Sequence, residues 1–260
     1  MRTISACIFI FLSISGICQE TYYDYVPLGS YHVGFCDNII YNQEIQYKQY
    51  GYEGNQPVFL QIWFPTAIDS DQDLMKFDDF RDRQVPEALE SVYQELLKHM
   101  DESFIRDGIT YHLETDNPID YGTKSYSDIL ELVKSQQTKS LRSALPVDAD
   151  YPVIVYHHGS QGMSDENSIM AEYFASRGYI FISANFHMPY PNTPFGLLPY
   201  ELEKENKHDQ STAKKVLQYA KSITSSNRLF FIGHSWGAQE GWCFLHEEDL
   251  ADGFISMETT

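Results

Sequence analysis

A serine between glycines is the residue of this chain best suited to nucleophilic chemistry. Ser235 lies at the centre of Gly233-His234-Ser235-Trp236-Gly237, which matches the pattern G-x-S-x-G. An apolar run over 229–232 precedes the motif, and residues 238–245 can form a helix. Strand, tight turn and helix in this order present a serine hydroxyl clear of a sheet. The motif therefore predicts a nucleophile, and the alternative is a turn serine with a structural hydroxyl.

A second glycine loop offers donors for the negative charge that attack by a serine generates. Residues 151–156 (YPVIVY) predict a buried strand, and HHGSQG follows directly at 157–162. Gly159 allows the backbone to bend so that an N–H points into a cleft. We expect the backbone N–H groups of Ser160 and Trp236 to form a two-donor oxyanion hole. The alternative is an ordinary glycine turn after a strand.

The elements that position both loops alternate along the second half of the chain. The sequence predicts strands over 151–156, 179–184, 229–232 and 253–257, and helices over 166–177, 209–223 and 238–245. This alternation is typical of an α/β fold with a doubly wound, mostly parallel sheet. Ligands of such sheets bind beyond the C-terminal ends of the strands, where both loops lie.

The first half of the chain predicts a different arrangement. A strand over 39–50, a turn at 51–55 and an alternating strand over 58–64 indicate an antiparallel hairpin at a sheet edge, ended by Pro65. Residues of about 69–145 interrupt the strand pattern as a helical insert. We expect its helices at 86–100 and about 127–140 to pack on the sheet, and the insert can also form one wall of a substrate cleft.

The N-terminal residues 1–18 predict a secretory signal peptide. A basic start at Arg2 precedes an apolar stretch over 4–17, and Gly16 and Cys18 fit a small-residue cleavage site. The alternatives are an uncleaved anchor, although the stretch is shorter than the ~20 residues of a spanning helix, and a lipid-modified Cys18. We therefore expect a domain over 19–260 that is secreted or periplasmic, without stable membrane insertion after cleavage.

Composition limits the class of partner. The 260 residues have a formal net charge of −19, which becomes −20 when Arg2 is removed with the signal peptide. Such a charge repels nucleic acid and anionic membranes, and 43% apolar residues indicate a globular protein. No sequence pattern predicts a metal site or a cofactor. Cys36 and Cys243 remain after cleavage; they form a disulfide, or Cys243 is a plain core residue.

The quoted motifs together resemble the α/β-hydrolase family. They are HHGSQG, NSIMAEYFASRGYIFISANF and FFIGHSWGAQ, and the resemblance covers about residues 29–260. The segments GSYHVGF and PVFLQIWFPTA are similar to the branch of plasma-type platelet-activating-factor acetylhydrolases, near the dienelactone-hydrolase-like esterases. The resemblance implies a serine esterase that acts on a small ester in lipid degradation, without a cofactor. It implies Ser235 as the nucleophile that forms an acyl-enzyme, with Ser160 and Trp236 as oxyanion donors.

The remaining catalytic residues depart from the family order of serine, acid and histidine. His246 is the histidine that follows Ser235, but it falls late on the predicted helix and should face solvent. Glu258 ends the last strand, where some hydrolases of this fold have their acid. We expect the histidines before the serine, which are His157, His158 and His187, to shape the cleft rather than to act as base.

These departures predict that the acid and histidine lie beyond Thr260 and that residues 1–260 are inactive or weakly active. Two alternatives to an ester hydrolase remain, namely a peptidase or lipase of the same superfamily and a non-catalytic, hydrolase-like binding protein. The loop over 186–200 is rich in proline and apolar residues. It either lines an acyl or leaving-group pocket or packs on the insert helices.

Overall fold

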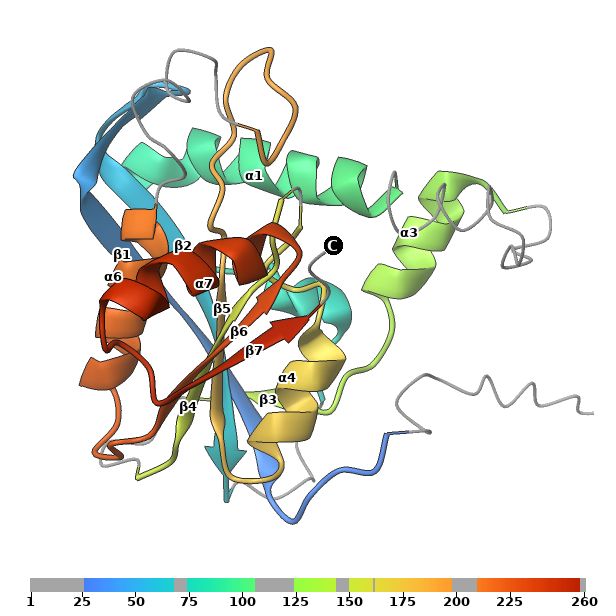
Figure 1. The fold of residues 1–260 in the computed structure, drawn as a ribbon. Helices are drawn as coiled ribbons and strands as arrows, with labels where there is room; N and C mark the ends of the chain where they lie inside the picture. Colours follow the sequence, from blue (N-terminus) through green and yellow to red (C-terminus); the bar gives the residue numbers. More distant parts are fainter. Residues whose placement is uncertain are drawn as a thin grey trace, which may run out of the picture.

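The computed structural model describes residues 26–67, 74–105, 124–143, 150–160, 162–197 and 210–257. These residues form a seven-stranded sheet of order β3-β1-β2-β5-β4-β6-β7 (Figure 1). The strands are β1 (His32–Gln49), β2 (Tyr52–Thr66), β3 (Ser140–Arg142), β4 (Val153–His157), β5 (Ile180–Ala184), β6 (Leu229–His234) and β7 (Gly253–Met257). The pairs from β5 to β7 are parallel, while β2 runs antiparallel to β1 and β5. The predicted α/β class, with its N-terminal antiparallel hairpin, is confirmed.

Helices cover both faces of this sheet. They are α1 (Glu90–Ser103), α3 (Tyr126–Lys134), α4 (Ser168–Ala175), α6 (Gln210–Ser222) and α7 (Trp236–Glu247), with short 3-10 turns η2 (Phe77–Phe80) and η3 (Glu87–Leu89). Buried residues of α6 and α7 share one hydrophobic cluster with the sheet, whereas those of α4 belong to the cluster of the opposite face. Figure 1 shows α1 across one end of the sheet.

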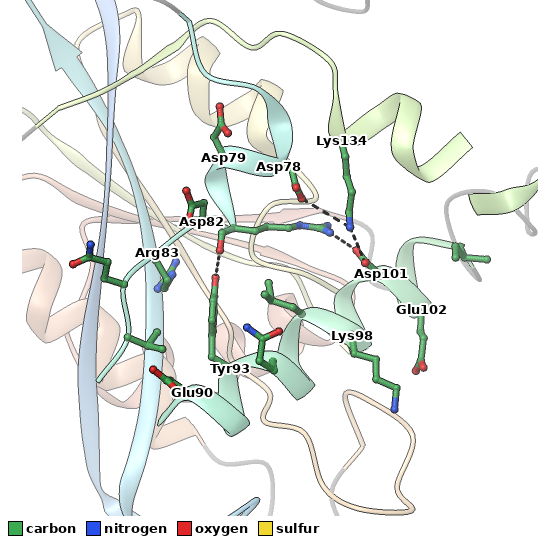
Figure 2. A pocket seen from close by; sticks show the side chains of 16 residues that line it. Asp78, Asp79, Asp82, Arg83, Glu90, Tyr93, Lys98, Asp101, Glu102 and Lys134 are labelled. Carbon is green, nitrogen blue, oxygen red and sulfur yellow. Dashed lines mark hydrogen bonds and ion pairs between the residues drawn. The ribbon is translucent and has the colours of Figure 1, made fainter. Parts of the chain in front are cut away.

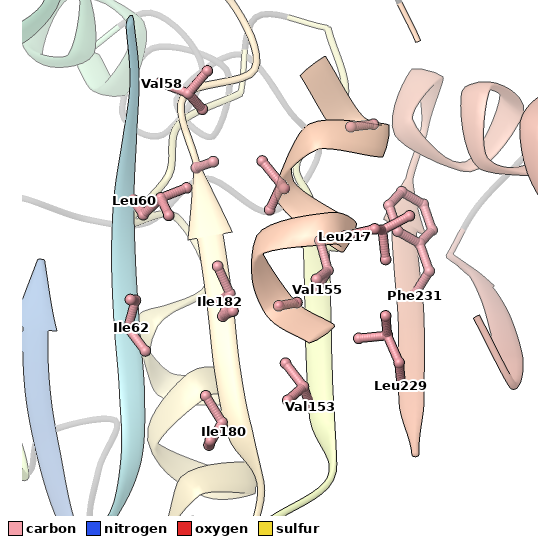
Figure 3. Close-up of a cluster of buried hydrophobic side chains, with 14 of the residues drawn as sticks. Val58, Leu60, Ile62, Val153, Val155, Ile180, Ile182, Leu217, Leu229 and Phe231 are labelled. Carbon is pink, nitrogen blue, oxygen red and sulfur yellow. The ribbon is translucent and has the colours of Figure 1, made fainter. Parts of the chain in front are cut away.

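The central strands are mainly apolar because both of their faces are covered. Along β4, Val153 and Val155 enter the cluster beside α6, while Ile154 and Tyr156 enter the cluster beside α4. Figure 3 shows Val153 and Val155 near Leu217 of α6. Successive side chains of a strand point to opposite faces, so a continuous apolar run is needed when neither face meets water.

The hairpin is longer than the sequence predicted. β1 and β2 turn at Tyr50 and Gly51, which both have positive φ, and β2 starts at Tyr52 within the predicted turn. Pro65 does not end β2, since it pairs with Val33 of β1. This proline is tolerated because β2 pairs with β5 only over residues 60–63, so the missing N–H leaves no bond unmade on that side.

The predicted helix over 127–140 was wrong at its end. Ser125 caps α3 through mutual bonds with Asp128, and the helix ends at Lys134. Residues 140–142 then form β3, which runs parallel to β1 at one outer edge of the described sheet. Glu172 of α4 holds this strand by accepting bonds from the Ser140 hydroxyl and the Lys139 amide. This distant partner explains why local periodicity alone missed β3.

The glycine that follows α4 has the backbone conformation predicted for it. Gly178 follows α4 with φ 93°, as expected of a residue that ends a helix, although α4 is shorter than its predicted range.

The predicted signal peptide, residues 1–18, lies outside the described residues. None of the helices that the structure describes is both long and apolar enough to cross a membrane.

Candidate active site

Ser235 occupies a strained turn between β6 and α7. Its backbone has φ 50° and ψ −120°, a combination that costs a residue with a Cβ about 1–3 kcal/mol. Backbone bonds hold the turn on both sides: the Ser235 N–H donates to the carbonyl of Met257 on β7, and the Ser235 carbonyl accepts from Ala238. The side chain of Ser235 is exposed. The turn therefore presents a hydroxyl to solvent at the C-terminal edge of the sheet.

The glycines of the motif allow β6, α7 and β4 to meet. A Cβ on Gly233 would lie 2.5 Å from the amide nitrogen of Ala238, and a Cβ on Gly237 would lie 2.6 Å from the carbonyl oxygen of His157. Both contacts are with backbone, which cannot move aside as a flexible side chain can. The two glycines thus let these elements approach closely, and the contacts exclude any side chain at either position.

The Gly159 turn after β4 lies against this elbow. Gly159 has φ 85°, and a Cβ there would lie 2.5 Å from the carbonyl oxygen of His234, 3.2 Å from the Trp236 nitrogen and 3.3 Å from the Ser235 Cβ. Within the described part of the chain, the amide of Ser160 donates to no acceptor. The structure therefore brings the Gly159 turn, which Ser160 follows, beside Ser235 and Trp236 at one edge of the sheet.

Three imidazoles surround the Gly159 peptide. The N–H of Gly159 donates to His157 Nδ1 at 3.0 Å. The carbonyl of Gly159 lies 2.8 Å from His158 Nδ1 and 2.7 Å from His187 Nε2, and a carbonyl only accepts, so both nitrogens donate. Burial, with His187 and His157 as neighbours, holds the pKa of His158 well below its ordinary value. These histidines fix the turn, as expected of residues that shape a cleft.

Glu166 is a titratable group of this region that the sequence did not indicate. The Tyr156 hydroxyl donates to its carboxylate at 2.6 Å, and the Met163 N–H donates at 3.3 Å. Although the residue is exposed, shielding of its carboxylate raises the pKa of Glu166 to about 6, and the bond from Tyr156 only partly offsets this. Its Oε2 would lie 2.8 Å from a Cβ on Gly162, which places it beside the oxyanion loop.

Other candidates from the sequence lie elsewhere. His246 is exposed near the end of α7, as predicted, and Glu258 lies outside the described residues. Cys36 and Cys243 are not paired, and the alternative of a core position for Cys243 is wrong because its side chain is exposed. Among the residues that the structure describes, no group of His, Cys, Asp and Glu could hold a metal ion.

The described part of the 186–200 loop packs against the insert. Met188, Tyr190 and Phe195 are buried in a cluster with residues of α1 and the hairpin, which favours the packing alternative. A cavity of about 510 Å³ also remains between this loop and α1. Its lining includes Phe195, whose ring centroid lies 6.5 Å from that of His187. The loop therefore joins the oxyanion turn to a neighbouring cavity.

A larger cavity of about 1140 Å³ lies between η2, α1 and α3 and is separate from this site. Its lining contains no residue of the elbow or of the Gly159 turn. Figure 2 shows Lys134 of α3 between Asp78 and Asp101 on its rim. Arg81 also pairs with Asp101, so these four charged groups link the elements around the cavity, which indicates a structural role for them.

Comparisons with known proteins support the fold. No protein-family model and no curated protein matches the sequence. A ferulic acid esterase from Streptomyces cinnamoneus is 14% identical with a TM-score of 0.50, over 91% of this chain and 63% of the esterase. A proposed α/β hydrolase from Agrobacterium tumefaciens is 20% identical over 41% of this chain and 48% of its own, with a TM-score of 0.32. A proposed dipeptidyl aminopeptidase IV from Bacteroides ovatus is 14% identical over 91% and 22%, with a TM-score of 0.39.

The likeness to the esterase shows a shared α/β fold and nothing finer, because so few residues are identical. The chain spans less than two thirds of the length of that esterase. Activity and substrate must therefore be argued from the site.

Proposed function

We propose that the protein is a serine hydrolase that cleaves carboxylic esters through an acyl-enzyme on Ser235. The observation that supports this most directly is the strained, exposed Ser235 beside the Gly159 turn. Strain of this kind persists only where the surrounding structure enforces it, and it concentrates at functional sites. A structural turn serine has no need of it.

The proposed chemistry follows from the positions of three backbone and side-chain groups. The Ser235 hydroxyl oxygen attacks the ester carbonyl carbon, and a base takes the hydroxyl proton. The resulting oxyanion accepts hydrogen bonds from the amides of Ser160 and Trp236. The carbon–oxygen bond to the leaving group breaks, the protonated base returns its proton to the alcohol, and water then hydrolyses the acyl-enzyme by the same route.

The identity of the catalytic base in this proposal rests on the order of catalytic residues in the family. That order puts an acid and a histidine after the serine. Among the described residues that follow Ser235, His246 is exposed and about three turns along α7, so it does not reach the hydroxyl. We expect the described residues alone to give only the residual catalysis of an oxyanion hole and a bound substrate.

The substrate class and location are further parts of this proposal. The esterase of similar fold is named for ferulic acid, and rings of Tyr50, Tyr190 and Phe195 line one part of the 510 Å³ cavity here, whose other part has charged residues of α1. These features support an ester with an apolar acyl group. The N-terminal resemblance supports the platelet-activating-factor acetylhydrolase branch and lipid substrates, and the predicted signal peptide supports export.

A fluorophosphonate probe tests the nucleophile directly. We expect it to label the whole natural gene product, which is the parent protein for every variant below, at Ser235, identified by mass spectrometry of the labelled peptide, and not to label Ser235→Ala. A series of p-nitrophenyl esters of increasing acyl length then measures turnover in both proteins. Equal turnover in parent and Ser235→Ala would contradict the proposal.

A second candidate is a non-catalytic, hydrolase-like binding protein, favoured by the remote position of His246. A p-nitrophenyl ester that binds the parent protein in calorimetry, with neither labelling nor turnover, would favour this candidate.

A further inference from the structure

His157 and Glu240 form a buried polar pair beneath the elbow. His157 ends β4 and is 1% exposed, while Glu240 lies on α7 and is 8% exposed. His157 Nε2 lies 3.1 Å from Glu240 Oε2. Burying a carboxylate is costly unless it is hydrogen-bonded, so a buried glutamate in the helix that follows the nucleophile requires an explanation.

The hydrogen bonds determine which imidazole nitrogen has the proton. Gly159 N–H is a donor, so His157 Nδ1 accepts and has no proton. The proton is therefore on Nε2, which faces the Glu240 carboxylate at 3.1 Å. A carboxylate that accepts from one nitrogen fixes both the tautomer and the direction of the ring. Phe186 stacks on the same ring, with centroids 3.8 Å apart and planes at 11°, and limits its tilt.

This arrangement connects α7 to the turn that contains the proposed oxyanion donor. Glu240 holds His157, His157 holds the N–H of Gly159, and the peptide that follows Gly159 contains the N–H of Ser160. A shift of the 158–159 peptide would move the Gly159 Cα, and with it the Ser160 N–H, although His158 and His187 hold the carbonyl of the peptide that follows. A donor that is misdirected by about 1 Å loses much of its effect on the transition state.

We propose that Glu240 and His157 are positioning residues that aim the Ser160 N–H at the oxyanion. The proposal rests on the function proposed above and deepens it. Neither residue touches the substrate, and their effect passes through the Gly159 peptide. The alternative is a buried pair that contributes only to folding.

Substitutions of Glu240 separate these roles. Glu240→Ala removes the acceptor, so we expect kcat for p-nitrophenyl acetate to fall about 10- to 100-fold with KM within about threefold, somewhat less than the loss of a whole donor. Glu240→Gln keeps an oxygen that accepts from His157 Nε2, so we expect it to retain kcat within about threefold.

A matched control comes from a second buried carboxylate. Glu172 is 0% exposed and accepts bonds from Ser140 and Lys139, on the side of β3. Glu172→Ala should lower the unfolding temperature without lowering kcat. An equal loss of kcat in Glu240→Ala and Glu172→Ala, or in Glu240→Ala and Glu240→Gln, would overturn the positioning role, as would an unchanged kcat in Glu240→Ala.

Nuclear magnetic resonance tests the same contact without turnover. We expect Glu240→Ala to shift the Gly159 amide proton and the ¹⁵N signals of His157, and Glu240→Gln to shift them less. If the parent shows no turnover that depends on Ser235, the proposed function fails. The resonances then test the positioning role of Glu240 and His157 without any assay of turnover. Unchanged Gly159 and His157 signals in Glu240→Ala would overturn that role, and shifted signals would support it.

Discussion

At Ser235 the backbone conformation that exposes the hydroxyl also destabilises the fold. Ser235→Gly should remove the strain of about 1–3 kcal/mol, less the 0.5–1 kcal/mol of extra chain entropy that glycine loses on folding. We expect this variant to be more stable than the parent by about 1 kcal/mol in urea unfolding. Ser235→Ala keeps the Cβ and should stay within about 0.5 kcal/mol of the parent. Equal stability of the two variants would show that the turn stores no strain.

Glu166 predicts a pH-dependent stability. Its pKa is about 6 in the folded protein and 4.5 ordinarily, so folding favours the protonated carboxyl. This contribution is present below pH 4.5 and is lost as pH rises to about 6. Glu166→Gln imitates the protonated form and retains an acceptor for Tyr156. Thermal unfolding should find it more stable than the parent above pH 6, with the difference shrinking toward pH 4.5; a constant difference would contradict this.

Residues of the site differed in how well the sequence predicted them. Ser235, Ser160 and Trp236 lie in short motifs whose glycines impose the turn locally, so their positions together could be predicted. The roles of Glu240 and Glu166 could not, because each pairs with a residue of another element. A glutamate in an amphipathic sequence looks solvated until the fold brings a partner to it.

Among the elements, Arg81 and Lys134 together join four segments that no sequence periodicity relates. It follows η2, is 4% exposed, and forms ion pairs with Asp101 of α1 and with Asp165 before α4, while Lys134 of α3 also bonds Asp101. Arg81→Met would leave the fully buried Asp165 without its cationic partner. We expect a loss of about 3–5 kcal/mol in the free energy of unfolding.

The matched control for Arg81 is an exposed ion pair. Lys48 and Glu53 lie 2.8 Å apart in the hairpin with side chains 71% and 69% exposed. Lys48→Met should cost less than about 1 kcal/mol in the same urea unfolding experiment. Similar losses in Lys48→Met and Arg81→Met would mean that burial of Asp165 is not what makes Arg81 important.

The strands and helices themselves were predicted best where both faces of a strand are buried. The strands β4, β5 and β6 match their apolar runs closely because most of their side chains are buried, while β7 matches its run although it is partly exposed. The three-residue β3 was missed because its stability comes from β1 and Glu172 rather than from its own sequence.

For the molecule as a whole, net charge predicts an effect of salt. A formal charge of −19 makes the folded chain repel itself, since compaction brings the acidic residues together. Sodium chloride screens this repulsion over a Debye length of about 8 Å near physiological ionic strength. We expect the unfolding temperature to rise between low salt and about 0.15 M sodium chloride. An unfolding temperature that is independent of salt would mean that local ion pairs already balance the charge.

The three tryptophans occupy three different environments. Trp63 is 0% exposed within the core, Trp242 is 69% exposed on α7, and Trp236 is partly buried directly after Ser235. Iodide in solution should therefore quench the fluorescence of Trp242 first and leave that of Trp63 untouched. With Trp242→Phe in place, any change of emission on acylation of the proposed nucleophile would come mainly from the adjacent indole of Trp236, which would then report occupancy of the site.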